Sequence, residues 1–588
     1  MPGGLIQLTG FGAQNVFLNG NPSMTYFTKM YKRHTNFAME HFHLPPTNVT
    51  DTNLPITGTK TFRFKVPRYA DLLHDCYLCV DIPDIWSPLA VIDPTNNIAK
   101  EFQYQWIRNL GYNMIQQASV TLNGTPIATM TGEWMKIASY LKHDATKRAI
   151  LDKMVGNTPD MYDPGNKSGL FNQYPNAINV DGVNAPAPSI AGRQLNIPLP
   201  FWFCEEIGQS LPLVSLVQSE VEIQITFNNI YSLFTIMNLN YNQPQDPSYL
   251  TRIVGNPSDP FRGLQNFLSY PDTQGNPTNQ SLQNWNFNPY IEANYIFLTD
   301  TERAHVAAYE KSFLITQVRY VRHDKHYGYN DVPIPMYNLC TRIVSLFQRE
   351  DRILLNDWDN YTNWDTIYCP PVNPSTLPSN VFSPLPPVQF YSSGIQLSNN
   401  MIAQDILQEG TVVLDGAERL NTKNVNFFRL IQNYKFSKGD TTMLPGINLY
   451  SFALDPNTIT QPSGTMNGSM FNRTNVQYTL LVPPTVTSTI DASGNIVPIS
   501  SPAPVCIIKG TEFNSVPTLV PAGATSVPVN AAGQATGPPL LQAGQTLTII
   551  PPSSQFNLQY GAYSSMIYIE SYNFLKVTNG QGNLVFST

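Results

Sequence analysis

The chain has 588 residues and a formal net charge of −7, with no basic run of the kind that neutralises nucleic-acid phosphates, so direct genome binding is not expected. Only 13% of the residues are charged, against about 25% in typical globular proteins, whereas Pro (49), Tyr (30) and Phe (30) are abundant. This composition favours strands joined by long turns, in about two or three β-sandwich domains. A polar surface of Asn, Gln, Ser and Thr costs less to desolvate than one of Lys or Glu, which suits burial against partner chains.

Synthesis in the cytosol is expected, because the region before Phe17 lacks the basic start and the continuous apolar stretch of a signal peptide. Pro2 rather than Gly follows Met1, so the N-myristoylation pattern is also absent. No run approaches the roughly 20 apolar residues that span a bilayer, so no membrane span is expected.

The first 28 residues are expected to form an arm that docks on another surface. The aromatic side chains of the arm and its immediate continuation are Phe11, Phe17, Tyr26, Phe27 and Tyr31. An aromatic ring buries a large apolar area when it finds a partner, so a segment this rich in rings seldom stays free in water. The arm is therefore expected to contact a neighbouring component.

Residues 29–235 are expected to form a first β-sandwich. Phe62, Phe64 and Val66 alternate with polar residues in 59–66, which predicts a half-buried strand. Asn123-Gly124 predicts a tight hairpin, because both central residues of such a turn need positive φ. The other expected elements are the hairpin strands within 118–128, strands at 72–82, 193–203 and 220–227, a helix at 133–142 and a long surface excursion at 143–192.

A connector with little core of its own is expected at 236–290, followed by a second β-sandwich at 291–588. Thr299 and Glu302 match a capping box ahead of a short helix that ends near Tyr309. The expected strands of this half are 313–321, 340–348, 411–414, 425–431, 447–454, 476–482 and 566–577. A Pro- and Asn-rich excursion is expected at 356–400, and a loop-rich insertion near 483–555 is interpreted as a small β unit.

One internal echo connects the two halves. Residues 120–124 and 412–416 share the pattern V-x-L-[N/D]-G. A strand that ends in Asn-Gly or Asp-Gly is a common hairpin signal, so five matching positions are weak support alone. Their separation is close to half the chain, as two tandem sandwiches require.

Metal and redox sites find little support in the sequence. Cys76 and Cys79 form a C-x-x-C in a predicted strand, where a spacing of three puts the two side chains on opposite faces, so core packing is the preferred interpretation. Histidine pairs that could offer two metal ligands each are His41 with His43 and His323 with His326. Neither pair has a third ligand at a recognisable spacing, and no cofactor is expected.

Catalytic patterns are also missing. Glu205 with Glu206, or Asp405 with Glu409, could be imagined as paired acids, but carboxylates this close in sequence are common. The segment GNKSG at 165–169 lacks the adjacent Gly-Lys of a phosphate-binding loop. No G-x-S-x-G or H-E-x-x-H pattern occurs, so an enzyme is not expected.

Several Asn-x-Ser/Thr triplets are possible glycosylation sites. Asn166 and Asn360 are the preferred candidates because they lie in expected excursions, and Asn48 and Asn279 are further ones. Asn123 is the poorest, because it lies in the predicted hairpin turn. Without a signal peptide none of them need meet the secretory glycosylation machinery.

Several blocks resemble major capsid proteins of nucleocytoplasmic large DNA viruses, in the same order along the chain. They are GAQNVFLNGNPSMTYF with YKRHTNFA (12–38), IRNLGYNMIQQASVTLNG with GEWMKI (107–137), IPLPFWFCEEIGQSLPLVSLVQSEVEIQITF (197–227), EANYIFLTDTERAHVAAYEKSFLITQV (292–318), GINLYSFALDP with QPSGTMNGS (446–469) and IESYNFLKVTNGQGNLVFS (569–587). The blocks touch both halves of the chain, whereas no such block is found in 236–290 or 483–555, which are expected to be outward loops.

The resemblance implies an all-β fold of two tandem eight-stranded jelly rolls with short helices and long loop excursions. It implies a homotrimer whose six sandwiches form a pseudo-hexagonal capsomer of an icosahedral shell, with neighbouring capsomers and minor capsid and penton proteins as partners. It also implies an internal membrane below the shell, assembly in the host cytoplasm and an arm on the inner side. The implied function is then to form the shell and not to catalyse a reaction.

Two alternatives belong to other classes. A carbohydrate-binding β-sandwich surface protein would use exposed aromatics and Asn-rich loops as a sugar platform, and it predicts a signal peptide and a monomer or small oligomer. A glycan-processing enzyme on a jelly-roll scaffold would need convergent acids that the sequence does not show. Assays of glycan binding and hydrolysis separate both from a shell protein.

Overall fold

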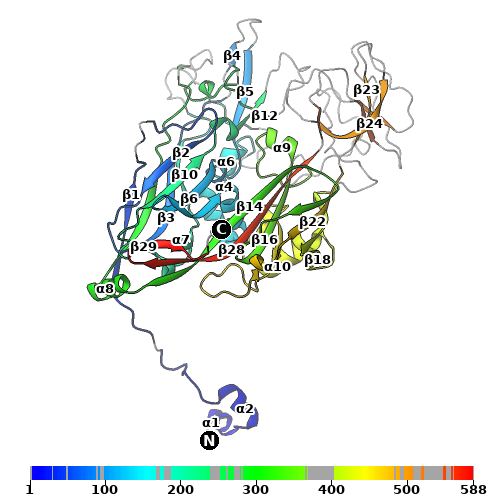
Figure 1. Ribbon diagram of the computed structural model, residues 1–588. Helices are drawn as coiled ribbons and strands as arrows, with labels where there is room; N and C mark the ends of the chain where they lie inside the picture. The colour runs from blue at the N-terminus through cyan, green and yellow to red at the C-terminus, as the bar shows by residue number, and fades with distance from the viewer. Residues whose placement is uncertain are drawn as a thin grey trace.

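The computed structural model describes most of the two halves of the chain. The described residues are 3–29, 31–47, 49, 51–87, 90–92, 99–166, 173–177, 187–238, 252–259, 262–270, 279, 282–364, 367, 403–482, 485–490, 496–507, 518–521, 547–550, 558–560 and 562–586. Most of the regular structure consists of β-strands. Figure 1 shows that the chain folds into two β-rich bodies that lie side by side.

The first body is a sandwich of two antiparallel sheets. One sheet has the order β1 (Phe37–Leu44), β13 (Tyr290–Leu298), β3 (Leu72–Ile82) and β8 (Arg193–Pro198). The other has the order β2 (Lys60–Lys65), β10 (Val221–Phe227), β6 (Ile115–Leu122) and β7 (Thr125–Thr131). The strict alternation in β2 and β10 follows the prediction, since every second side chain is buried between the sheets.

The second body repeats this arrangement with new strands. One sheet has the order β14 (Lys311–His326), β28 (Tyr563–Thr578), β16 (Leu339–Arg349) and β20 (Asn448–Ser451). The other has the order β15 (Tyr329–Pro333), β22 (Thr474–Leu480), β17 (Leu407–Leu414) and β18 (Ala417–Glu418).

Both bodies therefore have the same topology. If the eight principal strands of each body are counted in chain order, one sheet reads first, eighth, third, sixth and the other reads second, seventh, fourth, fifth. This order is that of a jelly roll, so two tandem eight-stranded jelly rolls are confirmed.

The internal echo marks equivalent turns in the two rolls. Asn123 (φ 49°) and Gly124 (φ 79°) join the fourth and fifth strands of the first roll, and Asp415 (φ 47°) and Gly416 (φ 83°) join those of the second. Positive φ at both central residues is the geometry that the Asn-Gly and Asp-Gly signals demand.

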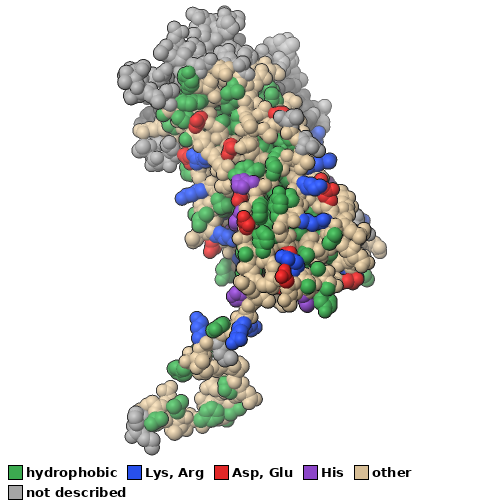
Figure 2. All heavy atoms as spheres, turned by 90° about the vertical axis from the view of Figure 1, so that its left-hand side faces the viewer, with side chains coloured by type: hydrophobic (Ala, Val, Ile, Leu, Met, Phe, Trp, Pro, Cys, Tyr) green, Lys and Arg blue, Asp and Glu red, His purple; other side chains and the backbone are tan. Residues whose placement is uncertain are grey.

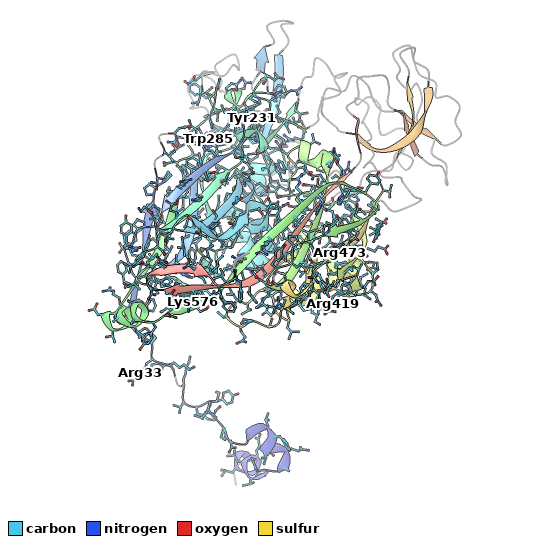
Figure 3. All side chains as sticks on the ribbon, in the orientation of Figure 1. Arg33, Tyr231, Trp285, Arg419, Arg473 and Lys576 are labelled. Atoms are coloured by element: carbon cyan, nitrogen blue, oxygen red, sulfur yellow. The ribbon has the colours of Figure 1, made fainter. Side chains whose placement is uncertain are left out.

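The prediction that residues 236–290 form a connector with little core of its own is wrong. It contributes β12 (Arg252–Val254) and most of β11 (Phe234–Asn238), which form a sheet with β5 (Ala99–Trp106) and β4 (Ala90–Ile92). Its buried aromatic side chains include Phe267, Trp285 and Phe287, and Figure 3 shows Trp285 within the first body. These rings are spaced too irregularly to produce a periodic pattern, so the sequence did not reveal this core.

Strand pairing also bears on the expected division between residues 290 and 291. That division cuts through β13, all of whose partners lie in the first roll: β1 on one side and β3 on the other. The eighth strand of the first roll thus comes just before α8 (Asp300–Ala308), the expected helix, which begins after Thr299 without the side-chain cap of a capping box.

Other expected segments differ locally. The excursion at 143–192 contains α5 (Ala145–Met154) and α6 (Pro159–Tyr162), and the end of the expected strand at 193–203 is α7 (Trp202–Glu205). The expected strand at 425–431 is instead a π-helical turn, Phe427–Ile431, that continues into α10 (Gln432–Phe436). Its aromatic and β-branched residues favoured a strand in the sequence, but the buried positions Phe428 and Gln432 follow a helical spacing.

Other expected helices and strands form in the described residues, although the strand expected at 447–454 is only β20, Asn448–Ser451. The helix α4 (Gly132–Lys142) forms as predicted, and the oxygen of Thr131 accepts a hydrogen bond from its Trp134 N–H. The insertion near 483–555 contains short strands, which are β23 (Thr485–Ile490), β24 (Ile496–Ile507), β25 (Thr518–Pro521) and β26 (Leu547–Ile550), followed by β27 (Leu558–Tyr560). Most of the excursion at 356–400 lies outside the described residues.

The two ends of the molecule differ. Insertions follow the third and seventh strands of each roll, and Figure 1 shows the labelled ones, β4, β5, β12, β23 and β24, at one end. The N-terminal arm leaves the opposite end, beside α8, where β1 begins at Phe37.

Candidate functional site

The N-terminal arm extends away from both rolls. It contains α1 (Gly3–Thr9) and α2 (Ala13–Asn19), neither of which has a buried residue. Phe17 is 95% exposed and Phe27 98%, and the other expected contact residues, Phe11, Tyr26 and Tyr31, are also exposed. Figures 2 and 3 show that the arm lies outside the two rolls, and Figure 3 labels Arg33 in the segment that connects the arm to them.

This exposure of rings is unusual for a folded chain. Besides the aromatics, the arm exposes large apolar side chains of both helices, namely Leu5, Ile6, Leu8, Val16 and Leu18. Exposed apolar patches are typical of sites of contact with other molecules. That the arm docks on a neighbouring component stays a prediction, and its two helices were not predicted from the sequence.

A second exposed apolar surface lies on the second roll. Leu430 and Ile431 from the π-helical turn and Tyr434 from α10 are exposed, Tyr434 to 93%. Residues three and four apart lie on one face of a helix, so these three side chains form one apolar ridge. We call Leu430, Ile431 and Tyr434 the α10 ridge.

The two rolls are joined by a buried ion pair. Lys136 of α4 donates to Asp359, which follows α9 (Glu350–Leu354) in the second roll, with 2.6 Å between Nζ and Oδ1. Asn109 and Asn113 donate to the same carboxylate at 2.6 and 3.0 Å. Burial alone would raise the pKa of Asp359, but Lys136 and the two amides lower it below its ordinary value.

A second polar contact crosses the same junction. The carboxylate of Glu133, at the start of α4, accepts hydrogen bonds from the hydroxyl groups of Tyr361 (2.6 Å) and Tyr568. Burial raises the pKa of both phenols, and the adjacent carboxylate raises it further, so both stay protonated as donors. Polar side chains of α4 therefore hold two separate segments of the second roll.

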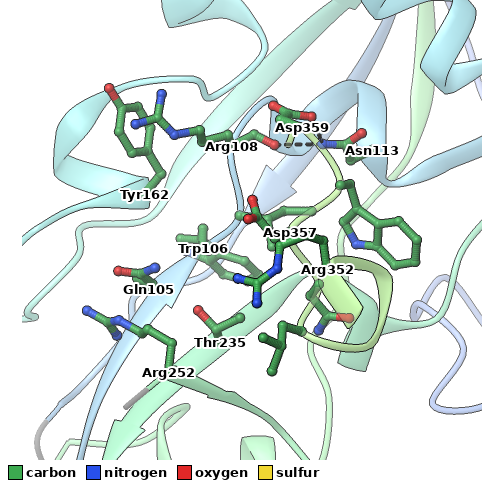
Figure 4. Close-up of a pocket in the computed structure, with 14 residues that line it drawn as sticks. Gln105, Trp106, Arg108, Asn113, Tyr162, Thr235, Arg252, Arg352, Asp357 and Asp359 are labelled. Atoms are coloured by element: carbon green, nitrogen blue, oxygen red, sulfur yellow. Dashed lines mark hydrogen bonds between the residues drawn. The ribbon is translucent and has the colours of Figure 1, made fainter. Parts of the chain in front are cut away.

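A cavity of about 220 Å³ lies beside these contacts. Figure 4 shows that its walls come from β5, α6, β11 and β12 of the first roll and from the segment around Arg352 and Asp359 of the second. The guanidinium carbon of Arg108 lies 4.1 Å from the ring centroid of Tyr162 at one edge of this space. The sequence reading singled out none of these residues.

Among the possible glycosylation sites, the prediction for Asn360 is wrong. It is fully buried, and its amide nitrogen donates to Asp357 and to the backbone oxygen of Trp364. A glycan on this nitrogen would require the local fold to open, so Asn360 is a structural residue. Asn166 and Asn279 are exposed, and Asn48 lies outside the described residues.

The cysteine and histidine pairs lie in ordinary environments. Cys76 and Cys79 are buried and contact different partners, and burial raises the pKa of Cys79 to about 11, which opposes thiolate chemistry. His43 lies 3.3 Å from Glu292, and His41 is exposed. In the described residues no group of three His, Cys, Asp or Glu side chains could hold a metal ion.

His323 and His326 do come together. Their rings stack with centroids 5.6 Å apart, and the Nδ1 atom of His326 lies 2.7 Å from the Tyr478 hydroxyl oxygen. Burial lowers the pKa of both imidazoles. The pair therefore serves packing and hydrogen bonding within the second roll.

One acid of each pair that was considered as catalytic forms an ion pair with a basic residue. Glu205 forms an ion pair with Lys142, and Asp405 forms one with Arg429. Of the GNKSG segment, residues 167–169 lie outside the described residues. The acids near one another in sequence thus take part in separate structural contacts.

Comparison with known proteins agrees with this architecture. A family model for the N-terminus of major capsid proteins matches residues 25–253, and a model for the large eukaryotic DNA virus major capsid protein matches residues 302–495, so the two together cover most of the chain. The chain belongs to the major capsid proteins of large eukaryotic DNA viruses.

Individual relatives extend this result. Probable capsid protein 4 of Acanthamoeba polyphaga mimivirus is 24% identical over 538 residues, which cover 82% of this chain and 93% of that protein. The major capsid protein of Phaeocystis pouchetii virus is 25% identical over 556 residues, with the same two coverages. The crystal structure of PBCV-1 VP54 has a TM-score of 0.55 at 16% identity and covers 96% of this chain and 100% of VP54, which supports the shared fold.

The capsid protein is thus a structural component of a virion shell. None of its described helices combines the length and the apolar character needed to cross a membrane.

Proposed function

We propose that the capsid protein assembles as a homotrimer whose six jelly rolls form a pseudo-hexagonal capsomer. The observation that carries this proposal is the identical strand order of the two rolls within one chain. Three-fold rotation of two similar wedges produces six similar sides, so that neighbouring capsomers can pack as hexagons. The exposed α10 ridge supports a contact between subunits, since an apolar ridge of this kind is stabilised when another chain covers it.

Images of the purified protein test this proposal. Negative-stain electron microscopy of the full chain should show particles with a six-cornered outline and three-fold symmetry. Two-fold particles, or single elongated bodies at micromolar concentration, would contradict it.

The arm supports a second part of the proposal, in which it lies on the inner side of the shell and contacts neighbouring capsomers and minor capsid and penton proteins. It leaves the end of the molecule opposite to the insertions, and its large apolar side chains are exposed in the described chain. An internal membrane below the shell and assembly in the host cytoplasm belong to the same proposal. Direct nucleic-acid binding and catalysis do not.

Deletion of residues 1–28 tests the role of the arm. The shortened chain should still form trimers, because no residue of α1 or α2 is buried against the rolls, but shells should fail to assemble. A second variant replaces Phe17, Tyr26 and Phe27 by Ser in the full-length chain. It removes the aromatic rings and keeps the length of the arm, so it should also fail to assemble shells. Normal shells from either variant would refute the role.

The division of the chain is also a proposal. We place the end of the first roll after β13 and the start of the second at β14, with α8 between them, while 1–28 remains the arm. The strand pairing of β13 supports this division, and the second family match, which begins at residue 302, agrees with it. Asn166 and Asn279 remain proposed glycosylation sites, which intact-mass measurement on virion protein would test.

A further inference from the structure

The two rolls of one chain meet through a helix of the first roll and a sheet face of the second. Ile567 and Ile569 of β28 pack in the core of the second roll, whereas Tyr568, between them, packs with the core of the first. The ring centroids of Tyr568 and Trp134 lie 5.4 Å apart, and the guanidinium carbon of Arg342 lies 5.7 Å from the Trp134 ring. The helix α4, which carries Trp134, therefore covers the outer face of the sheet that contains β28 and β16.

Strand edges meet beside this helix. The amide nitrogen of Gln317, on β14, donates to the backbone oxygen of Ile127, on β7, at 2.8 Å. The hydroxyl oxygen of Thr131, at the end of β7, lies 3.3 Å from that of Tyr568. The first roll thus contributes its fifth strand and the helix after it, and the second roll contributes its first strand and the adjacent sheet face.

Each of these surfaces has a counterpart in the other roll, because both rolls have the same strand order. In the second roll the fifth strand, β18, is followed by the short strand β19 (Lys423–Asn424) and then by the helix that carries the α10 ridge. In the first roll the sheet face that corresponds to β14, β28, β16 and β20 belongs to β1, β13, β3 and β8. The α10 ridge and this outer face are therefore two halves of the same kind of contact.

Both counterparts are uncovered in the single chain. Phe42 and Leu44 of β1 pack toward the core of the first roll, so the alternate residues of this strand point outward. Phe37 is 49% and Met39 is 41% exposed, whereas Tyr568 on the corresponding face of the second roll is 1% exposed. We call the exposed outward residues Phe37, Met39 and His41 the β1 face. Figure 2, which views the side of the molecule where β1 lies, shows hydrophobic and histidine side chains at this surface.

We propose that the α10 ridge of one copy docks on the β1 face of a second copy, as α4 docks on the second roll within one chain. This inference rests on the proposed trimer and names the surfaces that form its interface. Three contacts of this kind alternate with the three contacts inside the chains, so a three-fold axis closes a ring of six rolls. Leu430 and Ile431 on the ridge and Phe37 and Met39 on the face are then removed from water together, which stabilises the contact.

Cysteine cross-linking of the full-length protein tests this pairing. A chain that carries both Tyr434→Cys and His41→Cys should form covalent dimers and trimers with a short bismaleimide, detected on a denaturing gel. Each single variant should give no more cross-linked product than the wild type, because a ridge meets a β1 face and not another ridge. Tyr434 and His41 are both exposed, so neither substitution removes a side chain from the core.

A charge placed in the β1 face tests the same contact without a cross-linker. Met39→Asp should weaken the trimer by about tenfold or more in sedimentation velocity, because a carboxylate is desolvated when the ridge covers it. Tyr329→Asp is the matched control. Tyr329 is 65% exposed on β15, and β2, the counterpart of β15 in the first roll, makes none of the junction contacts described above, so this variant should keep the trimer.

The outcomes separate this pairing from the trimer itself. A wild-type protein that is not trimeric overturns the proposed function, and the pairing with it. A trimer in which the double cysteine variant gives no product above the single variants, or which Met39→Asp leaves intact, overturns the pairing alone. Covalent dimers from Tyr434→Cys alone would mean that two ridges meet across a two-fold axis, which also overturns it.

Discussion

Lys136→Met is expected to destabilise the capsid protein by leaving a buried carboxylate without its cation. Lys136 is 1% and Asp359 is 3% exposed, and the two atoms of the pair lie 2.6 Å apart. The substitution keeps most of the side-chain volume but leaves Asp359 with only the amides of Asn109 and Asn113. Because the pair joins α4 to the second roll, the effect is expected at the junction and not within one sandwich.

The expected loss follows from the burial of the pair. Removal of one partner of a buried ion pair costs about 3–5 kcal/mol, since the remaining charge is no longer compensated. Lys438→Met is the matched control: Lys438 and Asp455 form an ion pair of similar length, 2.7 Å, but their side chains are 54% and 38% exposed. Exposed pairs of this kind contribute about 0–1 kcal/mol.

Urea unfolding measured by tryptophan fluorescence and circular dichroism provides the assay, and the single variant Asp359→Leu and the double variant Lys136→Met/Asp359→Leu complete a double-mutant cycle. The double variant should recover much of the loss, because both charges are then removed from the interior. The pKa of Asp359 is lowered in the folded protein, so the contribution of its charged form is complete above the unfolded pKa of about 4 and declines as the pH falls through the lower folded value. A loss below about 1 kcal/mol at pH 7, equal to that of the Lys438 control, would refute the reasoning.

Two further predictions concern assembly and the repeated turns. Tyr434→Asp should leave the circular dichroism spectrum of the folded chain unchanged, because the ring is 93% exposed, but should abolish the trimer in sedimentation velocity. Tyr434→Phe should keep the trimer. A normal trimer from the Asp variant would remove the α10 ridge from the interface. Gly124→Ala and Gly416→Ala should each cost about 1–2 kcal/mol in urea unfolding, because both glycines have positive φ and open space around the added carbon. Gly208→Ala, which also meets open space but lacks positive φ, should change little, and an equal loss there would contradict the turn argument.

Local signals in the sequence were sufficient for much of the fold. The alternation in β2 and β10 and the Asn123-Gly124 turn are properties of neighbouring residues, so they identify strands and hairpins without tertiary information. The same holds for α4, whose apolar residues recur at helical spacing. The pairing of the two rolls needed the resemblance to a known family, because a five-residue echo alone is too short.

Other features depend on contacts that no local pattern reports. Lys136 and Asp359 are 223 residues apart, so the junction pair could not be inferred from the sequence. The helix α5 did leave a local signal, since the carboxylate of Asp144 accepts from the Lys147 N–H as an N-cap, but the surrounding Asn, Pro and Gly residues outweighed it. The glycosylation site at Asn360 was predicted from its Asn- and Pro-rich surroundings, but in the structure Asn360 is buried and donates a hydrogen bond to Asp357.

The mass of the purified full-length protein in solution, measured by light scattering across a range of concentrations, bears most directly on the two-roll capsomer. The account predicts a stable species of three times the 65.7 kDa chain mass. A monomer that persists at high concentration would contradict it.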